Sequence, residues 1–167
     1  YRPFQLEQMD ALVALAKDIK TRHDIPPERV LGHSDVAPVR KQDPGELFDW
    51  EGLAANGVGL WPPAPAAPCD EQDVPRLLDA IGYRTDLPLP VLVTAFQRHW
   101  APHRVDGVAD DATRARIAKR FPDAREGAPP PAVKRAIRDM AALLDGKKAD
   151  LSKIALDMDG VPEFHRR

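Results

Sequence analysis

The placement of prolines constrains this chain more than any other feature of its sequence. The chain contains 18 prolines, and seven of them gather in one stretch from Trp61 to Pro68 and in another at residues 129–131. Stretches of this kind favour extended linkers over packed structure. The sequence therefore predicts a first piece over residues 1–63, a linker over 64–70, a second piece over 71–120 and a tail over 121–167.

Charge and length exclude several classes of protein. The 167 residues suffice for one or two domains, and the formal net charge of −2 comes from charges of both signs mixed along the chain. This balance provides no field that would attract nucleic acid or an anionic membrane surface, so we expect neither partner. No apolar run approaches the ~20 residues needed to cross a bilayer. The single cysteine, Cys69, cannot form an internal disulfide, and its place in the linker predicts an exposed thiol.

The first piece shows a helical pattern followed by an irregular segment. Apolar residues recur at helical spacing from Leu6, and this pattern should end near His23 because prolines follow it closely. Residues 30–33 predict a short buried strand, and the turn-forming residues 34–45 predict a loop. A second helix is expected over residues 50–55, with Trp50 in the core.

The predicted loop holds residue types suited to metal chemistry. A neutral imidazole and a carboxylate are good zinc ligands, and His33 and Asp43 supply one of each. Lys41 could place a positive charge beside such a metal. From the residues alone, other interpretations stay open: His33 could be structural at a strand end, Asp43 a turn residue before Pro44, and Lys41 a solvated surface charge.

The run from His33 to Gly45 reads His-Ser-Asp-Val-Ala-Pro-Val-Arg-Lys-Gln-Asp-Pro-Gly. It resembles the zinc-site loop of the type 2 N-acetylmuramoyl-L-alanine amidases, the family related to phage T7 lysozyme and peptidoglycan recognition proteins. The AmiD-type bacterial envelope branch is the most similar, and the segments flanking the run agree with it. The resemblance implies hydrolysis of the amide between N-acetylmuramic acid and L-alanine in peptidoglycan, in the periplasm or cell envelope.

The resemblance also assigns residues. It implies that His33 and Asp43 are zinc ligands and that Lys41 is the catalytic lysine. Asp35 and Arg40 fall at recurrent positions of the motif, and we interpret them as residues that shape the loop. In this family the first zinc histidine and the catalytic glutamate lie upstream of the helix that begins this chain. We therefore expect an α/β amidase remnant, truncated at its N-terminus, that binds zinc weakly and hydrolyses little by itself.

The second piece contains three helical stripes of apolar residues, near the lower limit for an independent core. Its signatures, Leu-x-x-Ile-Gly-Tyr, Ala-Phe-Gln-Arg-His-Trp and Val-Asp-Gly-Val-Ala-Asp-Asp-Ala-Thr, resemble the type 1 peptidoglycan-binding domain. We expect a small three-helix bundle with Phe96 and Trp100 in its core. Four polar residues could instead face a ligand: Gln97, Arg98, His99 and His103. This piece supports an alternative function, a non-catalytic peptidoglycan-binding module.

The tail, residues 121–167, predicts a helix over 132–144 followed by irregular structure. It resembles the segment of O6-methylguanine-DNA methyltransferases that leads into their DNA-binding domain. The acceptor motif of that family, Pro-Cys-His-Arg, is absent, so no alkyl transfer is expected. The tail supports a third reading, a relic of a DNA alkyltransferase fusion, and a tail particular to one amidase lineage stays open beside it. The sequence does not predict an oligomeric state.

Overall fold

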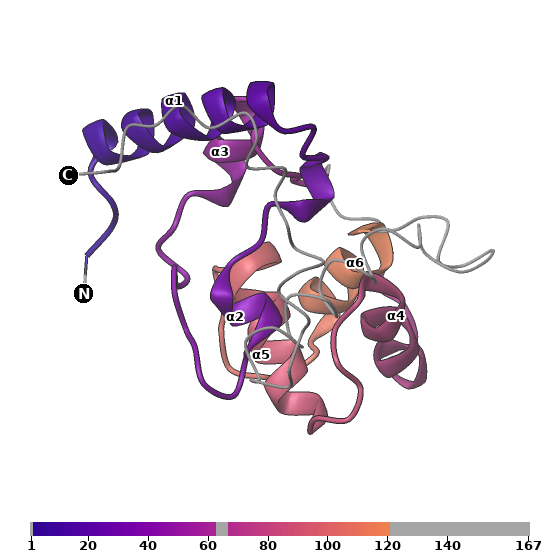
Figure 1. Cartoon of the computed structure of the whole chain (residues 1–167). Helices are drawn as coiled ribbons and strands as arrows, with labels where there is room; N and C mark the ends of the chain where they lie inside the picture. The colour runs from indigo at the N-terminus through magenta and orange to yellow at the C-terminus, as the bar shows by residue number, and fades with distance from the viewer. Residues whose placement is uncertain (1, 63–66, 121–167) are drawn as a thin grey trace.

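The computed structural model describes residues 2–62 and 67–120, and the predictions for the tail lie outside these ranges (Figure 1). The helices, with two 3-10 turns, follow one another along the chain. They are α1 (Leu6–Arg22), η1 (Pro27–Arg29), α2 (His33–Val36), α3 (Trp50–Ala55), η2 (Glu71–Asp73), α4 (Val74–Ile81), α5 (Leu89–Trp100) and α6 (Asp111–Arg120). The helices predicted for the first piece, and the Gly82 end of α4, are confirmed within a residue or two.

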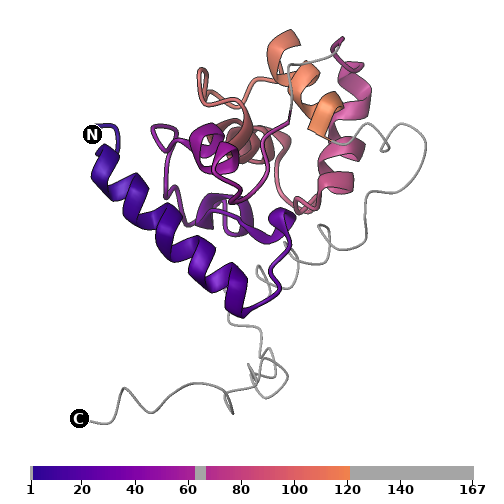
Figure 2. The ribbon, with the colours of Figure 1, turned by 90° about the horizontal axis from the view of Figure 1, so that it is seen from above.

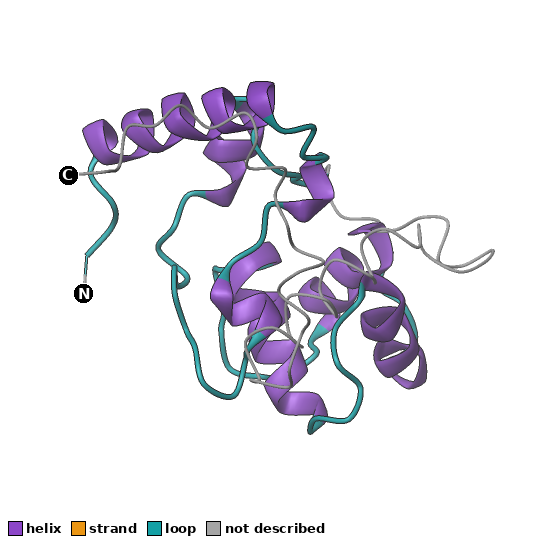
Figure 3. Ribbon diagram, in the orientation of Figure 1, coloured by secondary structure: helices purple, strands orange, loops and turns teal. Residues whose placement is uncertain are grey.

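The predicted strand over residues 30–33 is wrong. Figure 3 shows helices and loops, and no strand occurs within residues 2–62 and 67–120, so the α/β class expected for the first piece is not seen there. A strand needs a neighbouring strand to pair its backbone groups. Here Val30 N instead donates to Pro27 O at 3.2 Å, and the Asp35 carboxylate accepts from Gly32 N at 2.8 Å. The first bond closes the 3-10 turn η1, and the second starts a helical turn at His33 where a strand was expected.

Helix α1 lies along one side of the molecule and packs through one face only (Figure 2). Leu12, Val13 and Ala16 contact a small cluster that includes Phe48 and Leu53. No residue of α1 is fully buried, and Leu15 on the helix is 56% exposed. The helix therefore contributes less apolar burial than its 17-residue length would allow.

A second and larger core joins α4, α5 and α6. Phe96 and Trp100 are buried in it, as the sequence predicts, and α4 packs against α6. Two residues from outside residues 71–120 belong to the same core: Val36 of α2, which packs on α5, and Cys69. The Cys69 side chain is 6% exposed, so the expectation of an exposed thiol is wrong, because this part of the predicted linker lies against the core.

Gly82 ends α4 in the left-handed conformation, with φ of 115°, and its N–H donates to Leu78 O and Asp79 O. An L side chain at this φ is strained by about 1–2 kcal/mol. We therefore expect Gly82→Ala to lower the free energy of unfolding by about 1 kcal/mol, measured by urea denaturation. Ala80→Gly, a change inside the same helix, provides a comparison, because here the introduced glycine lowers the stability of the helix. Equal stability of Gly82→Ala and the wild type would contradict the capping role.

Candidate metal centre

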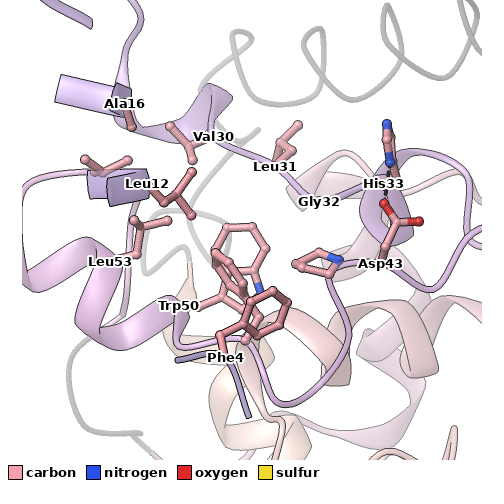
Figure 4. Close-up of a pocket in the computed structure, with 13 residues that line it drawn as sticks. Phe4, Leu12, Ala16, Val30, Leu31, Gly32, His33, Asp43, Trp50 and Leu53 are labelled. Carbon is pink, nitrogen blue, oxygen red and sulfur yellow. Dashed lines mark hydrogen bonds and ion pairs between the residues drawn. The ribbon is translucent and has the colours of Figure 1, made fainter. Parts of the chain in front are cut away.

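The side chains of His33 and Asp43 point toward one another, as Figure 4 shows. His33 is the first residue of α2, and Asp43 follows it after a loop. His33 Nδ1 lies 2.5 Å from Asp43 Oδ2, and the two side chains are 52% and 59% exposed. The chain thus presents an imidazole and a carboxylate together, at a place that solvent and ligands can reach.

Two backbone features hold the ends of this loop together. Ser34 N donates to Asp43 O at 3.1 Å, which joins the residue after His33 to Asp43 itself. Gly32 lets Pro44 approach closely, since a Cβ atom on Gly32 would lie 2.8 Å from Pro44 Cδ and 3.3 Å from Trp50 Cζ2. The Asp43–Pro44 peptide bond is cis. A glycine before the histidine is therefore needed for the two side chains to converge.

The electrostatics of the site keep the carboxylate ionised. The hydrogen bond from His33 lowers the pKa of Asp43 below its ordinary value of 3.8, and the charges of His33 and Lys41 act in the same direction. Lys41 is exposed and lies on the same loop, two residues before Asp43. The three residues that the sequence singles out thus lie near one another, with His33 and Asp43 in direct contact.

The donor set matches part of what zinc requires. Imidazole nitrogen and carboxylate oxygen are ordinary zinc ligands, and a catalytic zinc usually takes three protein ligands. Within residues 2–62 and 67–120, no group of three or more His, Cys, Asp or Glu side chains is placed to hold a metal ion. His33 and Asp43 therefore supply two donors of the types that zinc takes.

A cavity of about 440 Å³ opens beside the pair (Figure 4). Its wall is mainly apolar and comes from α1, α3 and the segments around them. The lining residues include Phe4, Leu12, Ala16, Val30, Leu31, Phe48, Trp50, Leu53 and Val58. Polar ligand groups near the mouth of an apolar cavity are a common arrangement of binding sites.

Asp35 does more than shape the loop. Its carboxylate is 2% exposed and accepts three hydrogen bonds: from Gly32 N at 2.8 Å, from Tyr83 Oη at 2.7 Å and from His99 Nδ1 at 2.7 Å. Burial, the largest single influence, raises the pKa of Asp35. The charge of His99 and the hydrogen bonds from His99, Tyr83 and Gly32 together outweigh it, so the pKa lies below 3.8.

Two polar residues of α5 lie in the core. Gln97 and His99 are buried, with 0% and 1% exposure, so the alternative in which they face a ligand is wrong for these two. Gln97 Oε1 accepts from Asp106 N and Gly107 N, and this helix-to-loop contact explains its burial. His103 is exposed and lies beyond the end of α5.

His99 is also held on both faces of its ring. It stacks on Trp50 with ring centroids 3.7 Å apart and on Trp100 with centroids 3.6 Å apart. Its partner Asp35 is 64 residues away in the sequence. No periodicity or motif connects residues so far apart, which is why sequence reasoning missed this pair.

Comparison with known proteins agrees with the motif at the site. The family described as N-acetylmuramoyl-L-alanine amidase matches residues 1–46. Over 131 residues, the chain is 40% identical to N-acetylmuramoyl-L-alanine amidase AmiD of Escherichia coli (strain K12). The aligned region covers 69% of this chain and 48% of AmiD. The chain thus spans about half the length of this relative.

Solved structures give the same result. One is AmiD from E. coli in complex with the substrate anhydro-N-acetylmuramic acid-L-Ala-D-gamma-Glu-L-Lys, at 39% identity and a TM-score of 0.62, covering 70% of this chain and 52% of that one. Another is AmpDh3 from Pseudomonas aeruginosa, at 32% identity and a TM-score of 0.58, covering 71% and 54%. The chain is therefore related to the enzymes of the N-acetylmuramoyl-L-alanine amidase family.

Proposed function

We propose that this chain is part of a zinc-dependent peptidoglycan amidase that hydrolyses the amide between N-acetylmuramic acid and L-alanine. The observation that carries the proposal is the contact of His33 Nδ1 with Asp43 Oδ2, at 2.5 Å, inside the segment that matches the amidase family. The substrate class is supported by the similar AmiD structure, which was solved with an anhydro-muramic peptide.

Each site residue has a role in this proposal. His33 and Asp43 would hold zinc, which when bound polarises the amide carbonyl and makes water a better nucleophile. A histidine ligand binds zinc as the neutral imidazole, and a carboxylate ligand binds it in the ionised form. Lys41, exposed on the same loop, would stabilise the negative charge that develops on the amide oxygen. Because the described residues provide two donors, the chain alone should bind zinc weakly and hydrolyse little.

Residues 71–120 would act as a peptidoglycan-binding module in this proposal, and the place of action would be the cell envelope. The core that α4, α5 and α6 share gives these residues the folded unit that such a module needs. The described part of the chain has no helix long and apolar enough to cross a membrane. A non-catalytic wall-binding module is the alternative, and it differs from the amidase in needing neither His33 nor Asp43.

One experiment separates these functions. The chain is joined in frame to the upstream region of E. coli AmiD that the match does not include, and the fusion is incubated with zinc and a muropeptide. We expect release of the L-alanine-terminated peptide, detected by mass spectrometry. A sedimentation assay on insoluble peptidoglycan runs in parallel. Sedimentation without any hydrolysis by the fusion would favour the non-catalytic module. If the fusion neither hydrolysed the muropeptide nor sedimented with peptidoglycan, both functions would be contradicted.

Lys41→Ala provides a finer test of the proposed mechanism. Removing one group that stabilises a developing oxyanion costs about 10²–10³-fold in kcat. We expect a loss of about this size in the fusion, with zinc affinity little changed, because Lys41 is not a proposed ligand. Lys17→Ala, at an exposed lysine of α1, should retain full activity. An unchanged kcat for Lys41→Ala would show that this lysine does not act on the substrate.

A further inference from the structure

We propose that His99 is a positioning residue for His33, acting through Asp35, so that the second piece of the chain helps to set the geometry of the metal centre. The inference rests on the proposed function in one respect, since it takes His33 as a zinc ligand. It assigns to residues 71–120 a role in the site in addition to the binding of peptidoglycan.

The contacts form a short path from α5 to His33. One oxygen of Asp35, Oδ2, accepts from His99 Nδ1 at 2.7 Å and from Gly32 N at 2.8 Å. Gly32 is the residue immediately before His33, and Asp35 lies two residues after it. The other oxygen, Oδ1, accepts from Tyr83 Oη at 2.7 Å. The Asp35 carboxylate is thus linked to the turn that carries His33 in two ways: Asp35 belongs to that turn, and Gly32 before His33 donates to it. The contacts with α5 and with the end of α4 hold this carboxylate in place.

His99 is itself held firmly enough to serve this purpose. Its ring lies between Trp50 of α3 and Trp100 of α5, with interplanar angles of 20° and 7°. Trp50 also lies beside Gly32, where an added Cβ would approach its ring to 3.3 Å. The same tryptophan therefore lies beside both His99 and Gly32, and the His99 ring can point its Nδ1 only within narrow limits.

The turn that carries His33 depends on such support. Helix α2 has four residues, and an isolated helix of that length is not stable in water. Its burial against α5, through Ser34, Asp35 and Val36, is what keeps it folded. Because His33 is half exposed, its own side chain contributes little to this packing. Its position is therefore set by its neighbours, and through Asp35 by His99.

The test measures the zinc affinity of the full chain, with zinc alone as the probe and a chromophoric chelator as competitor. His99→Phe keeps a flat ring between the tryptophans and removes Nδ1. We expect the Kd for zinc to rise about tenfold, the lower end of the effect of removing a residue that orients a ligand. His99→Asn, whose amide N–H₂ can reach the position of Nδ1, should recover much of the loss. Tyr83→Phe, which removes the bond to Oδ1, should shift the Kd in the same direction by less.

A matched control excludes a general loss of stability. Ile117→Val lowers the stability of the same core by about 0.5–1.5 kcal/mol and removes no hydrogen bond to Asp35. It should leave the Kd unchanged. A second readout needs no metal: NMR relaxation of the His33 ring should report greater motion in His99→Phe and not in Ile117→Val.

The outcomes separate the inference from the function on which it rests. The inference would be overturned if His99→Phe kept the zinc affinity of the wild type and a His33 ring as rigid as in the wild type. It would also be overturned if Ile117→Val raised the Kd for zinc as much as His99→Phe does. The proposed function fails under a different result, namely wild-type zinc affinity in His33→Ala. In that case a mobile His33 ring in His99→Phe would still establish the positioning contact.

Discussion

His33→Ala should lower the zinc affinity of this chain by more than about 100-fold. Residues that merely orient a zinc ligand are worth about 10–100-fold in affinity, so the loss of a ligand itself should exceed that range. After the change, Asp43 is the remaining donor of the pair, and its side chain is 59% exposed to competing water. In the fusion with the upstream part of AmiD, hydrolysis of the muropeptide should fall below detection.

Isothermal titration with zinc, or competition with a chelator, measures this loss. His23→Ala is the control, because it removes another exposed histidine, at the end of α1. The fold should not be affected, since a half-exposed side chain such as that of His33 contributes within about 0.5 kcal/mol. If zinc affinity and amidase activity both survived in His33→Ala, His33 would not be a ligand, and the central assignment would be wrong.

Asp35→Ala should lower the free energy of unfolding by about 3–5 kcal/mol. Removing one partner of a buried charged pair leaves the other without its partner, and here three donors lose their acceptor together: Gly32 N, Tyr83 Oη and His99 Nδ1. Domains are stable by about 5–15 kcal/mol, so a large part of the stability would be lost. Urea denaturation followed by tryptophan fluorescence measures the change.

An exposed aspartate provides the control for this prediction. The Asp111 side chain is 84% exposed and pairs with Arg114 one helical turn away, so Asp111→Ala should cost at most about 0.5 kcal/mol. A similarly small effect of Asp35→Ala would show that the buried pair does not stabilise the fold.

Protonation of Asp35 by acid should lower the free energy of unfolding, as Asp35→Ala does. The pKa of Asp35 is lower in the folded chain than its ordinary value of 3.8. The stability that its ionised form contributes is therefore present above about pH 4 and is lost as the pH falls through the folded pKa. In Asp35→Asn this part of the acid dependence should disappear. Unchanged acid unfolding in that variant would assign the acid sensitivity to other groups.

The local structure of this chain follows from its sequence because the deciding interactions are local. The helical spacing from Leu6 and the prolines after His23 predict α1 closely, since backbone hydrogen bonds within a helix span four residues. Gly82 predicts the end of α4 for the same reason. The motif from His33 to Gly45 likewise predicts that His33 and Asp43 lie close together, because both residues belong to a single loop.

The strand predicted over residues 30–33 could not be judged from the sequence, because a strand depends on a partner elsewhere in the chain. The described residues offer none, and the Asp35 carboxylate starts a helical turn at His33 instead. The burial of Cys69 and His99 was missed for a related reason, since each is buried by residues distant in the sequence.

By itself, then, the sequence predicted α1, α3 and the end of α4 and singled out His33 and Asp43, while the tertiary structure alone decided that Asp35 meets His99, 64 residues away. Helical spacing and turn residues act over a few positions, and the sequence displays them directly. The contact between the loop and α5 exists because folding buries a carboxylate, and a buried carboxylate must find hydrogen-bond donors wherever the packing brings them.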